Sequence, residues 1–193
     1  ELNTLAEQTL LLQNGVLELA PKDNGYEAQS MAVLKERNIR FERLLPGPIE
    51  RVWAYLVESE KRAKWLAGGE FELRVGGKIE LIFENDKLSE ESRNFGTKGM
   101  GGVITRLEPL KLLAHTWKWG DGESDVVYEL FPRGKDVLLT IHHRLPESGG
   151  VNRGVAGGWA SHVGILADLL EGKKPRPFWS THDREVKTFE ATL

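Results

Sequence analysis

The sequence contains no cysteine among its 193 residues. Disulfide bonds, thiol nucleophiles and cysteine-ligated metal sites are therefore excluded together. The sequence also has no apolar run as long as a membrane span, and its first residues lack a basic segment followed by an apolar one. From these absences we expect a cytoplasmic protein with no membrane span.

Neither sign of charge is in large excess. The chain has 26 Lys and Arg residues against 29 Asp and Glu, a formal net charge of −3, and no basic run. A nucleic-acid partner is therefore not expected. Hydrophobic residues make up 40% of the chain, which is typical of one globular domain with a sizeable core. We predict a single domain over residues 1–193, with an N-terminal extension at 1–37, a core at 38–172 and a C-terminal tail helix at 173–193.

Motifs for phosphate binding and for common catalytic sites are missing as well. The chain has no GxGxxG, GxxxxGK, GxSxG or HExxH pattern. His142 and His143 are adjacent on a predicted strand, so their side chains point to opposite faces and cannot bind one metal ion from one side. We therefore assign no catalytic residue, no metal site and no cofactor.

The N-terminal region fits two structures. Residues 3–13 fit a short helix, whereas residues 9–19 fit a hairpin with its turn at Asn14-Gly15. We favour a strand at 16–19 and leave the rest open. Residues 22–29 are polar and typical of a turn.

From Asn38 onward, apolar and polar residues alternate clearly enough to predict individual elements. Strands are predicted at 39–45, 71–75, 79–83, 103–107, 112–119, 125–131 and 137–145, and helices at 49–56, from Ser59, at 151–171 and at 178–189. Gly76-Gly77 is predicted to be a two-residue turn between strands, and residues 85–100 a mobile, solvated loop.

The helix predicted at 151–171 carries an apolar stripe. Its inward residues recur at three- and four-residue spacing: Val155, Trp159, Val163, Leu166 and Leu170. We expect this helix to cover the apolar face of the sheet. Gly164 in its interior suggests that another backbone or a ligand approaches closely there. We also expect Phe178 or Trp179 to dock on the domain or across a dimer interface, because two adjacent aromatic rings are poorly placed in water.

Five segments carry a family resemblance in order along the chain. They are RLLPGPIERVW (43–53), KWL (64–66), LRVGGKIEL (73–81), LEPLKLLAHTWKW (107–119) and GGWASHVGILADLLEG (157–172). Over residues 36–172 the sequence resembles bacterial homologues of the C-terminal domain of the heat-shock-90 ATPase activator, in the START-like, SRPBCC superfamily. This resemblance implies an α+β helix-grip fold, also that of the birch pollen allergen, with a curved antiparallel sheet wrapped around a long C-terminal helix.

The resemblance implies a function but no reaction, since members of the superfamily bind lipids, polyketides, hormones or other hydrophobic molecules and share no catalytic set. Our leading hypothesis is non-enzymatic binding of a hydrophobic small molecule in an internal cavity. One alternative is a cyclase or hydrolase that uses His143 with His162 or Tyr128. Another is a protein-interaction role with a chaperone partner, and a homodimer is also left open.

Aromatic and histidine side chains at inward positions are our candidates for the ligand site, because they offer large apolar faces with a few polar atoms. These candidates are Trp65, Trp117, Tyr128, His143, Trp159 and His162. The sequence leaves open whether these residues line the cavity or belong to the hydrophobic core. Arg43 falls on the face of its predicted strand that otherwise carries apolar residues. We expect its side chain at the rim of the domain, beside an acidic neighbour.

Overall fold

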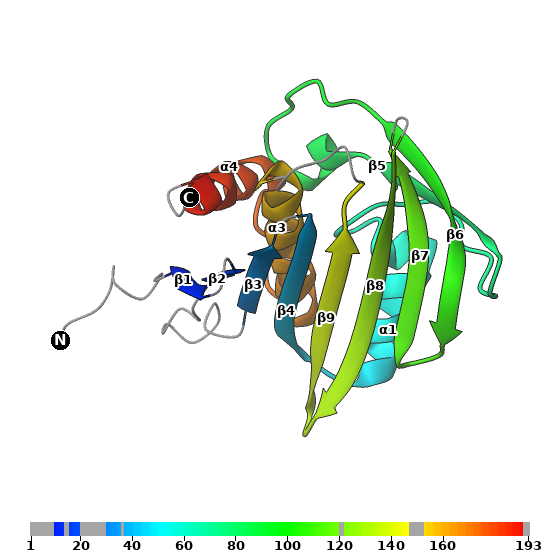
Figure 1. Ribbon diagram of the computed structural model, residues 1–193. Helices are drawn as coiled ribbons and strands as arrows, with labels where there is room; N and C mark the ends of the chain where they lie inside the picture. Colours follow the sequence, from blue (N-terminus) through cyan, green and yellow to red (C-terminus); the bar gives the residue numbers. More distant parts are fainter. Residues whose placement is uncertain are drawn as a thin grey trace.

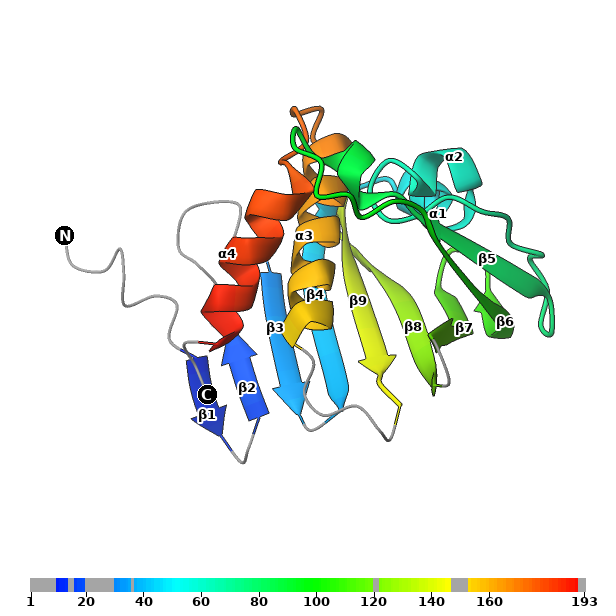
Figure 2. The same cartoon turned by 90° about the horizontal axis from the view of Figure 1, so that it is seen from above.

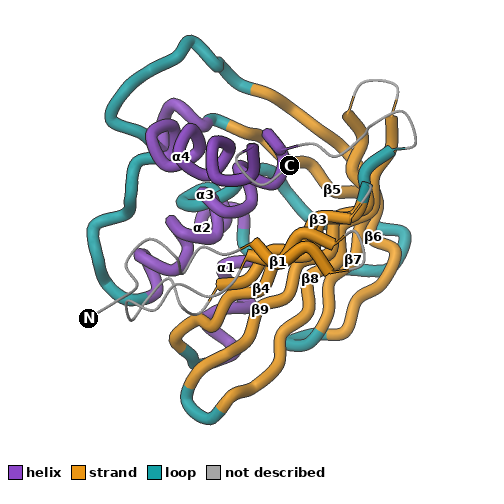
Figure 3. Tube along the Cα trace, turned by 60° about the vertical axis from the view of Figure 1, so that its left-hand side comes forward, coloured by secondary structure: helices purple, strands orange, loops and turns teal. Residues whose placement is uncertain are grey.

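Helix α3 (Arg153–Leu170) lies across the inner face of a curved nine-stranded sheet in the computed structural model of the protein (Figure 1). The structure describes residues 10–13, 16–19, 30–35, 37–119, 122–146 and 153–190. The helices gather on one side of the sheet (Figure 3). None of the helices in these ranges is long and apolar enough to cross a membrane.

All neighbouring strands of the sheet pair antiparallel, in the order β1-β2-β3-β4-β9-β8-β7-β6-β5. The strands are β1 (Leu10–Gln13), β2 (Val16–Leu19), β3 (Ser30–Lys35), β4 (Asn38–Pro46), β5 (Lys78–Phe83), β6 (Lys98–Glu108), β7 (Leu112–Trp119), β8 (Gly122–Arg133) and β9 (Asp136–Arg144). β4 pairs antiparallel with β9, which follows it only much later in the sequence, and Phe41 lies opposite Ile141. The predicted α+β helix-grip fold is confirmed.

The N-terminal hairpin is also confirmed as the better of the two predicted structures. β1 pairs with β2, and Gln13 faces Val16 across the hairpin. Strand β3 was not predicted, although it pairs with β4 over its whole length. The predicted polar turn at 22–29 lies outside the described residues.

The predicted strand at 71–75 is wrong. Only two isolated bridges form in this region, Gly68 with Ile82 and Phe71 with Ile79, and Val75 is 63% exposed. The chain turns back so tightly that a Cβ atom on Gly77 would lie 2.0 Å from the Glu72 carbonyl oxygen. The Gly77 backbone then pairs with Ile104 of β6 instead of continuing a regular hairpin.

Helices α1 (Ile49–Val57) and α2 (Ser59–Arg62) are held together by a buried arginine. The guanidinium of Arg62 donates hydrogen bonds to the carbonyl oxygens of Leu56, Val57, Ala67 and Gly69. It also lies 3.6 Å from the centre of the Phe71 ring. Burial lowers the pKa of Arg62 to about 10, so the guanidinium remains charged at neutral pH. Its hydrogen bonds hold the two helices and the following loop together.

Helix α4 (Phe178–Glu190) runs alongside α3 (Figure 2). One glycine of α3 lies against α4, and a second lies against the segment that leads into it. A Cβ atom on Gly157 would lie 2.7 Å from Cγ2 of Val186, and one on Gly164 would lie 2.9 Å from the guanidinium of Arg176. Arg176 in turn forms a two-pronged ion pair with Asp168 of α3. The close neighbour at Gly164 is thus the side chain of Arg176, and not the backbone or ligand that was expected.

Candidate functional site

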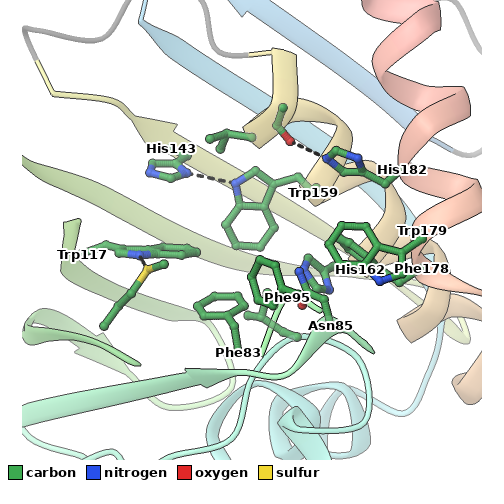
Figure 4. Close-up of a pocket in the computed structure, with 15 residues that line it drawn as sticks. Phe83, Asn85, Phe95, Trp117, His143, Trp159, His162, Phe178, Trp179 and His182 are labelled. Atoms are coloured by element: carbon green, nitrogen blue, oxygen red, sulfur yellow. Dashed lines mark hydrogen bonds between the residues drawn. The ribbon is translucent and has the colours of Figure 1, made fainter. Parts of the chain in front are cut away.

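A cavity of about 290 Å³ lies between the sheet, the first half of α3 and the start of α4 (Figure 4). Its described lining is Leu66, Phe83, Asn85, Phe95, Met100, Trp117, His143, Gly154, Val155, Gly158, Trp159, His162, Phe178, Trp179 and His182. None of these residues is Asp, Glu, Lys or Arg. The cavity therefore has an aromatic wall with a few neutral polar groups, as small-molecule sites often do.

Three stacked rings form one wall of the cavity. The Trp117 ring of β7 lies between Phe83 of β5, at a centroid distance of 5.3 Å, and His143 of β9, at 5.2 Å. Trp159 of α3 stands almost perpendicular to Trp117, with an interplanar angle of 84°. The stack and the upright indole together make a corner that offers a flat face and an edge to a bound ring.

A directed chain of hydrogen bonds fixes this corner. Trp159 Nε1 donates to His143 Nδ1 at 3.0 Å, and His143 Nε2 lies 2.9 Å from the hydroxyl oxygen of Ser124. The Ser124 hydroxyl donates to the carbonyl oxygen of Trp117. Because indole can only donate, His143 Nδ1 must be the acceptor and Nε2 must carry the proton. Both ring nitrogens of His143 are therefore occupied.

His162 of α3 has one occupied and one unoccupied ring nitrogen. Its Nδ1 lies 2.6 Å from the carbonyl oxygen of Trp65, which can only accept, so Nδ1 carries the proton. In the neutral ring, Nε2 is then an acceptor. The described residues provide no hydrogen-bond donor to Nε2.

Burial keeps His143 and His162 neutral. Loss of hydration lowers the pKa of His143 to about 3, with a smaller effect from His115. Loss of hydration also lowers the pKa of His162 to about 4, although its hydrogen bond to the Trp65 carbonyl acts in the opposite direction. At neutral pH both rings are uncharged.

The start of α4 covers the cavity and is fastened to the loop between β5 and β6. Phe178 packs on His162 at a centroid distance of 4.6 Å, and Trp179 Nε1 donates to the Asp86 carboxylate at 2.8 Å. Asp86 lies in the 3₁₀ helix η2 (Asn85–Leu88). Arg93 of the same loop forms a two-pronged ion pair with Asp183 of α4. The predicted docking of the tail aromatics on the domain is confirmed.

Asp86 organises the loop that was predicted to be a solvated connection. Its carboxylate accepts hydrogen bonds from the backbone N–H groups of Arg93 and Phe95 and from the hydroxyl of Ser92. These bonds, that from Arg93 first, together with the one from Trp179, lower the pKa of Asp86 to about 2. The loop is therefore corrected to a structured cover that contacts α4.

Four of the six predicted site residues line the cavity: Trp117, His143, Trp159 and His162. The other two are core residues that support it. Trp65 is fully buried, and its indole N–H donates to the carbonyl oxygen of Tyr55. Tyr128 lies behind Trp159 and packs its ring against that indole at 5.9 Å.

Sequence reasoning missed Asn85, Phe95 and Met100 as parts of the cavity, and it assigned no site role to Phe178, Trp179 or His182. All lie in the β5–β6 region or in the tail, which fold back from distant parts of the sequence. The adjacent pair Phe178-Trp179 was the one signal available. No comparable sequence signal marked Asn85.

Arg43 lies deeper than expected. Its side chain is buried, with 3% exposure, rather than at a rim. The acidic neighbour is Asp168 of α3. Burial opposes ionisation of that carboxyl, but hydrogen bonds from Arg176 and the charge of Arg43 hold its pKa below the usual value.

The two adjacent histidines of β9 point to opposite faces, as predicted. His142 lies on the outer face, 3.7 Å from Glu129, while His143 faces the cavity. Within the described ranges, no three His, Asp or Glu side chains are placed to hold a metal ion.

This architecture and its aromatic cavity define a START-like, helix-grip domain. The family model described as activator of Hsp90 ATPase homolog 1-like protein matches residues 46–171. The chain therefore belongs to this family. No curated protein sequence shows significant similarity to the chain.

Solved structures show the same fold. The protein encoded by gene BPP1335 of Bordetella parapertussis is 37% identical, with a TM-score of 0.68, and the match covers 90% of this chain and 92% of that one. CalU16 of Micromonospora echinospora is 19% identical, with a TM-score of 0.60 and coverage of 84% and 88%. DynU16 is 22% identical, with a TM-score of 0.60, and the match covers 72% of this chain and 49% of that protein.

Proposed function

We propose that the protein binds a hydrophobic small molecule in this cavity without transforming it. The observation that carries the proposal is a cavity whose described lining combines six large aromatic side chains with no Asp, Glu, Lys or Arg. A ligand would gain about 25 cal/mol for each Å² of apolar surface that it buries there. The family membership supports this function, because the fold is that of a ligand-binding domain.

The ligand is expected to be uncharged. A carboxylate or phosphate would need a guanidinium or ammonium group inside, and the described lining provides none. The two neutral histidines show that the same surroundings already disfavour charge. A neutral molecule with rings or an alkyl chain avoids this desolvation cost.

An enzyme in the same cavity is the second candidate. It would need a pair of groups that can exchange a proton with a substrate. His143 and His162 both line the cavity, but His143 is fully hydrogen-bonded to Trp159 and Ser124. Its low pKa also makes it a weak base at neutral pH. Binding without reaction is therefore the better-supported function.

A partner role with a chaperone rests on the family description alone. We rank it below ligand binding because the cavity gives the latter a site with named residues. Measuring the ATPase rate of a heat-shock-90 chaperone with and without saturating protein separates the two. An unchanged rate would remove the chaperone role.

The proposed function is tested by extracting the purified protein with organic solvent and identifying the released molecules by mass spectrometry. In parallel, the ligand-stripped protein is titrated with naphthalene by NMR. The proposal predicts saturable shifts at backbone amides of α3 and β9 around the cavity. If naphthalene and every extracted molecule fail to bind at saturating concentration, the proposal is wrong.

A further inference from the structure

The polar atoms around the cavity divide into those already paired and those left for a ligand. The following inference rests on the proposed function and concerns the chemistry of the ligand. All three indole N–H donors in the described lining are already used. Trp117 donates to the sulfur of Met100, Trp159 to His143 Nδ1 and Trp179 to Asp86. A ligand that offers only acceptors finds none of these donors free.

Two buried side chains of the lining, Asn85 and His162, each keep an acceptor that receives no hydrogen bond from the described residues. His162 directs its proton to the Trp65 carbonyl, which leaves the lone pair of Nε2 without a donor from the described residues. Asn85 is 93% buried, and its Oδ1 has no hydrogen-bond partner within the described part of the chain. Asn85 and His162 both line the cavity (Figure 4). Such a buried, unpaired acceptor is costly unless something donates to it.

We propose that the cavity binds a neutral aromatic molecule that carries a hydroxyl group, and that this hydroxyl lies between Asn85 and His162. The hydroxyl donates its proton to one of the two acceptors, and its oxygen can accept from the Asn85 amide N–H₂ group. The fused or linked rings then extend along the corner made by Trp117 and Trp159, where aromatic faces and edges are available. The volume of about 290 Å³ suits a molecule of two or three rings.

Other ligand classes fit this arrangement less well. A carboxylate would place its charge against two acceptors with no cation in the described lining. A quaternary ammonium could use the aromatic faces but would leave Asn85 Oδ1 without a donor. An ether or a plain hydrocarbon would fill the space but would also leave both acceptors unpaired.

The test compares ligands that differ at one group. Isothermal titration calorimetry measures the binding of 2-naphthol, 2-methoxynaphthalene, naphthalene, 2-naphthoate and a trimethylammonium derivative of naphthalene to the stripped protein. We expect 2-naphthol to bind about tenfold or more tightly than 2-methoxynaphthalene and naphthalene, since the lost hydrogen bonds leave buried acceptors unpaired. The two charged compounds should bind more weakly still.

A variant locates the selectivity. Asn85→Leu keeps the number and branching of the side-chain heavy atoms but removes the acceptor, so the preference for 2-naphthol over naphthalene should shrink to about threefold or less. Asn38→Leu, at an exposed position of β4, is the matched control and should keep the full preference. Circular dichroism and the melting temperature establish that both variants are folded; should Asn85→Leu not fold, the ligand comparison in the unaltered protein decides alone.

The outcomes separate this inference from the proposed function. If all the neutral compounds bind equally well, the protein binds hydrophobic molecules but the hydroxyl site is wrong. Tightest binding by the ammonium compound or by the carboxylate would likewise overturn the hydroxyl site. If none of the compounds binds, the hydroxyl site is wrong, and if every extracted molecule fails to bind as well, the proposed function itself falls.

Discussion

Trp159 Nε1 donates a hydrogen bond of 3.0 Å to His143 Nδ1, which joins the helix to the sheet at the cavity wall. This bond fixes the tautomer of His143 and, through its other nitrogen, the direction of the bond to Ser124. A single indole thus both shapes the cavity and removes a histidine from acid–base chemistry.

Helix α3 should contribute strongly to stability by covering the sheet. Leu166 is fully buried, so Leu166→Ala should lower the free energy of unfolding by about 2–5 kcal/mol. Denaturant unfolding followed by circular dichroism measures this change. Leu73→Ala, at a residue that is 48% exposed, is the control and should change it by about 0.5 kcal/mol or less. A loss below about 1 kcal/mol for Leu166→Ala would show that the helix is not the cover of the sheet.

The Ser124 hydroxyl should stabilise the fold through His143. Ser124→Ala leaves the N–H of His143 Nε2 unpaired in a buried place, which should cost about 1–3 kcal/mol. Thermal and denaturant unfolding provide the measurement. Ser180→Ala at an exposed site of α4 is the matched control, with no expected change. Equal stability of the two variants would mean that the hydrogen-bond chain has no structural role.

Stability should fall as the solution is acidified below about pH 6.5. Burial lowers the pKa values of His115, His143 and His162 from 6.5 to about 4, 3 and 4. Between these values and pH 6.5 the unfolded chain binds protons that the folded chain does not, so the free energy of unfolding rises with pH across this window. Each histidine contributes up to about 1.4 kcal/mol per pH unit, and its contribution is complete above about pH 6.5.

A pair of adjacent substitutions tests the source of this dependence. His143→Gln should remove about one histidine's share of the slope, measured by denaturant unfolding between pH 4 and 6.5. His142→Gln on the outer face should remove less, because that side chain is 44% exposed. A pH-independent stability in the unaltered protein would contradict the neutral, buried state of these rings.

The tail should be part of the folded unit. Phe178 is 2% exposed and packs on His162, so Phe178→Ala should cost about 3–5 kcal/mol. Arg184→Ala on the exposed side of α4 is the control, with a change of about 0.5 kcal/mol or less. Truncation after Lys174 should lower the melting temperature as well, and an unchanged value would refute the docking.

The cavity wall should carry ligand affinity. Trp159→Ala removes the upright indole and should weaken naphthalene binding more than tenfold while the protein stays folded. Trp53→Ala in α1, outside the described lining, should leave the affinity unchanged. If Trp159→Ala unfolds the protein and no ligand is ever found, these aromatics are core and the site is absent.

Periodicity predicted most of the fold and part of the site. Strand parity placed Trp117 and His143 on the inner face, and helical phase brought Trp159 and His162 to the same space, because both are local properties of an element. The same rules could not show that Tyr128 is a core residue and not part of the cavity wall. Tyr128 also faces inward on its strand, but it lies behind Trp159. Depth below a surface depends on which element packs on top.

The remaining cavity residues depend on contacts between segments far apart in sequence. Asn85 and Phe95 enter the site because Asp86 folds its loop and bonds to Trp179, 93 residues away. The failed strand at 71–75 has a similar cause, since its alternating pattern was overridden by the close return of the chain at Gly77. Such tertiary contacts leave little trace in local patterns.

The most direct test of the account is a crystal structure of the protein with 2-naphthol bound. The account predicts the fused rings in the corner between Trp117 and Trp159, beneath Phe178, with the hydroxyl within hydrogen-bonding distance of Asn85 or His162. Naphthol bound only on the outer surface, with side chains filling the cavity, would contradict it.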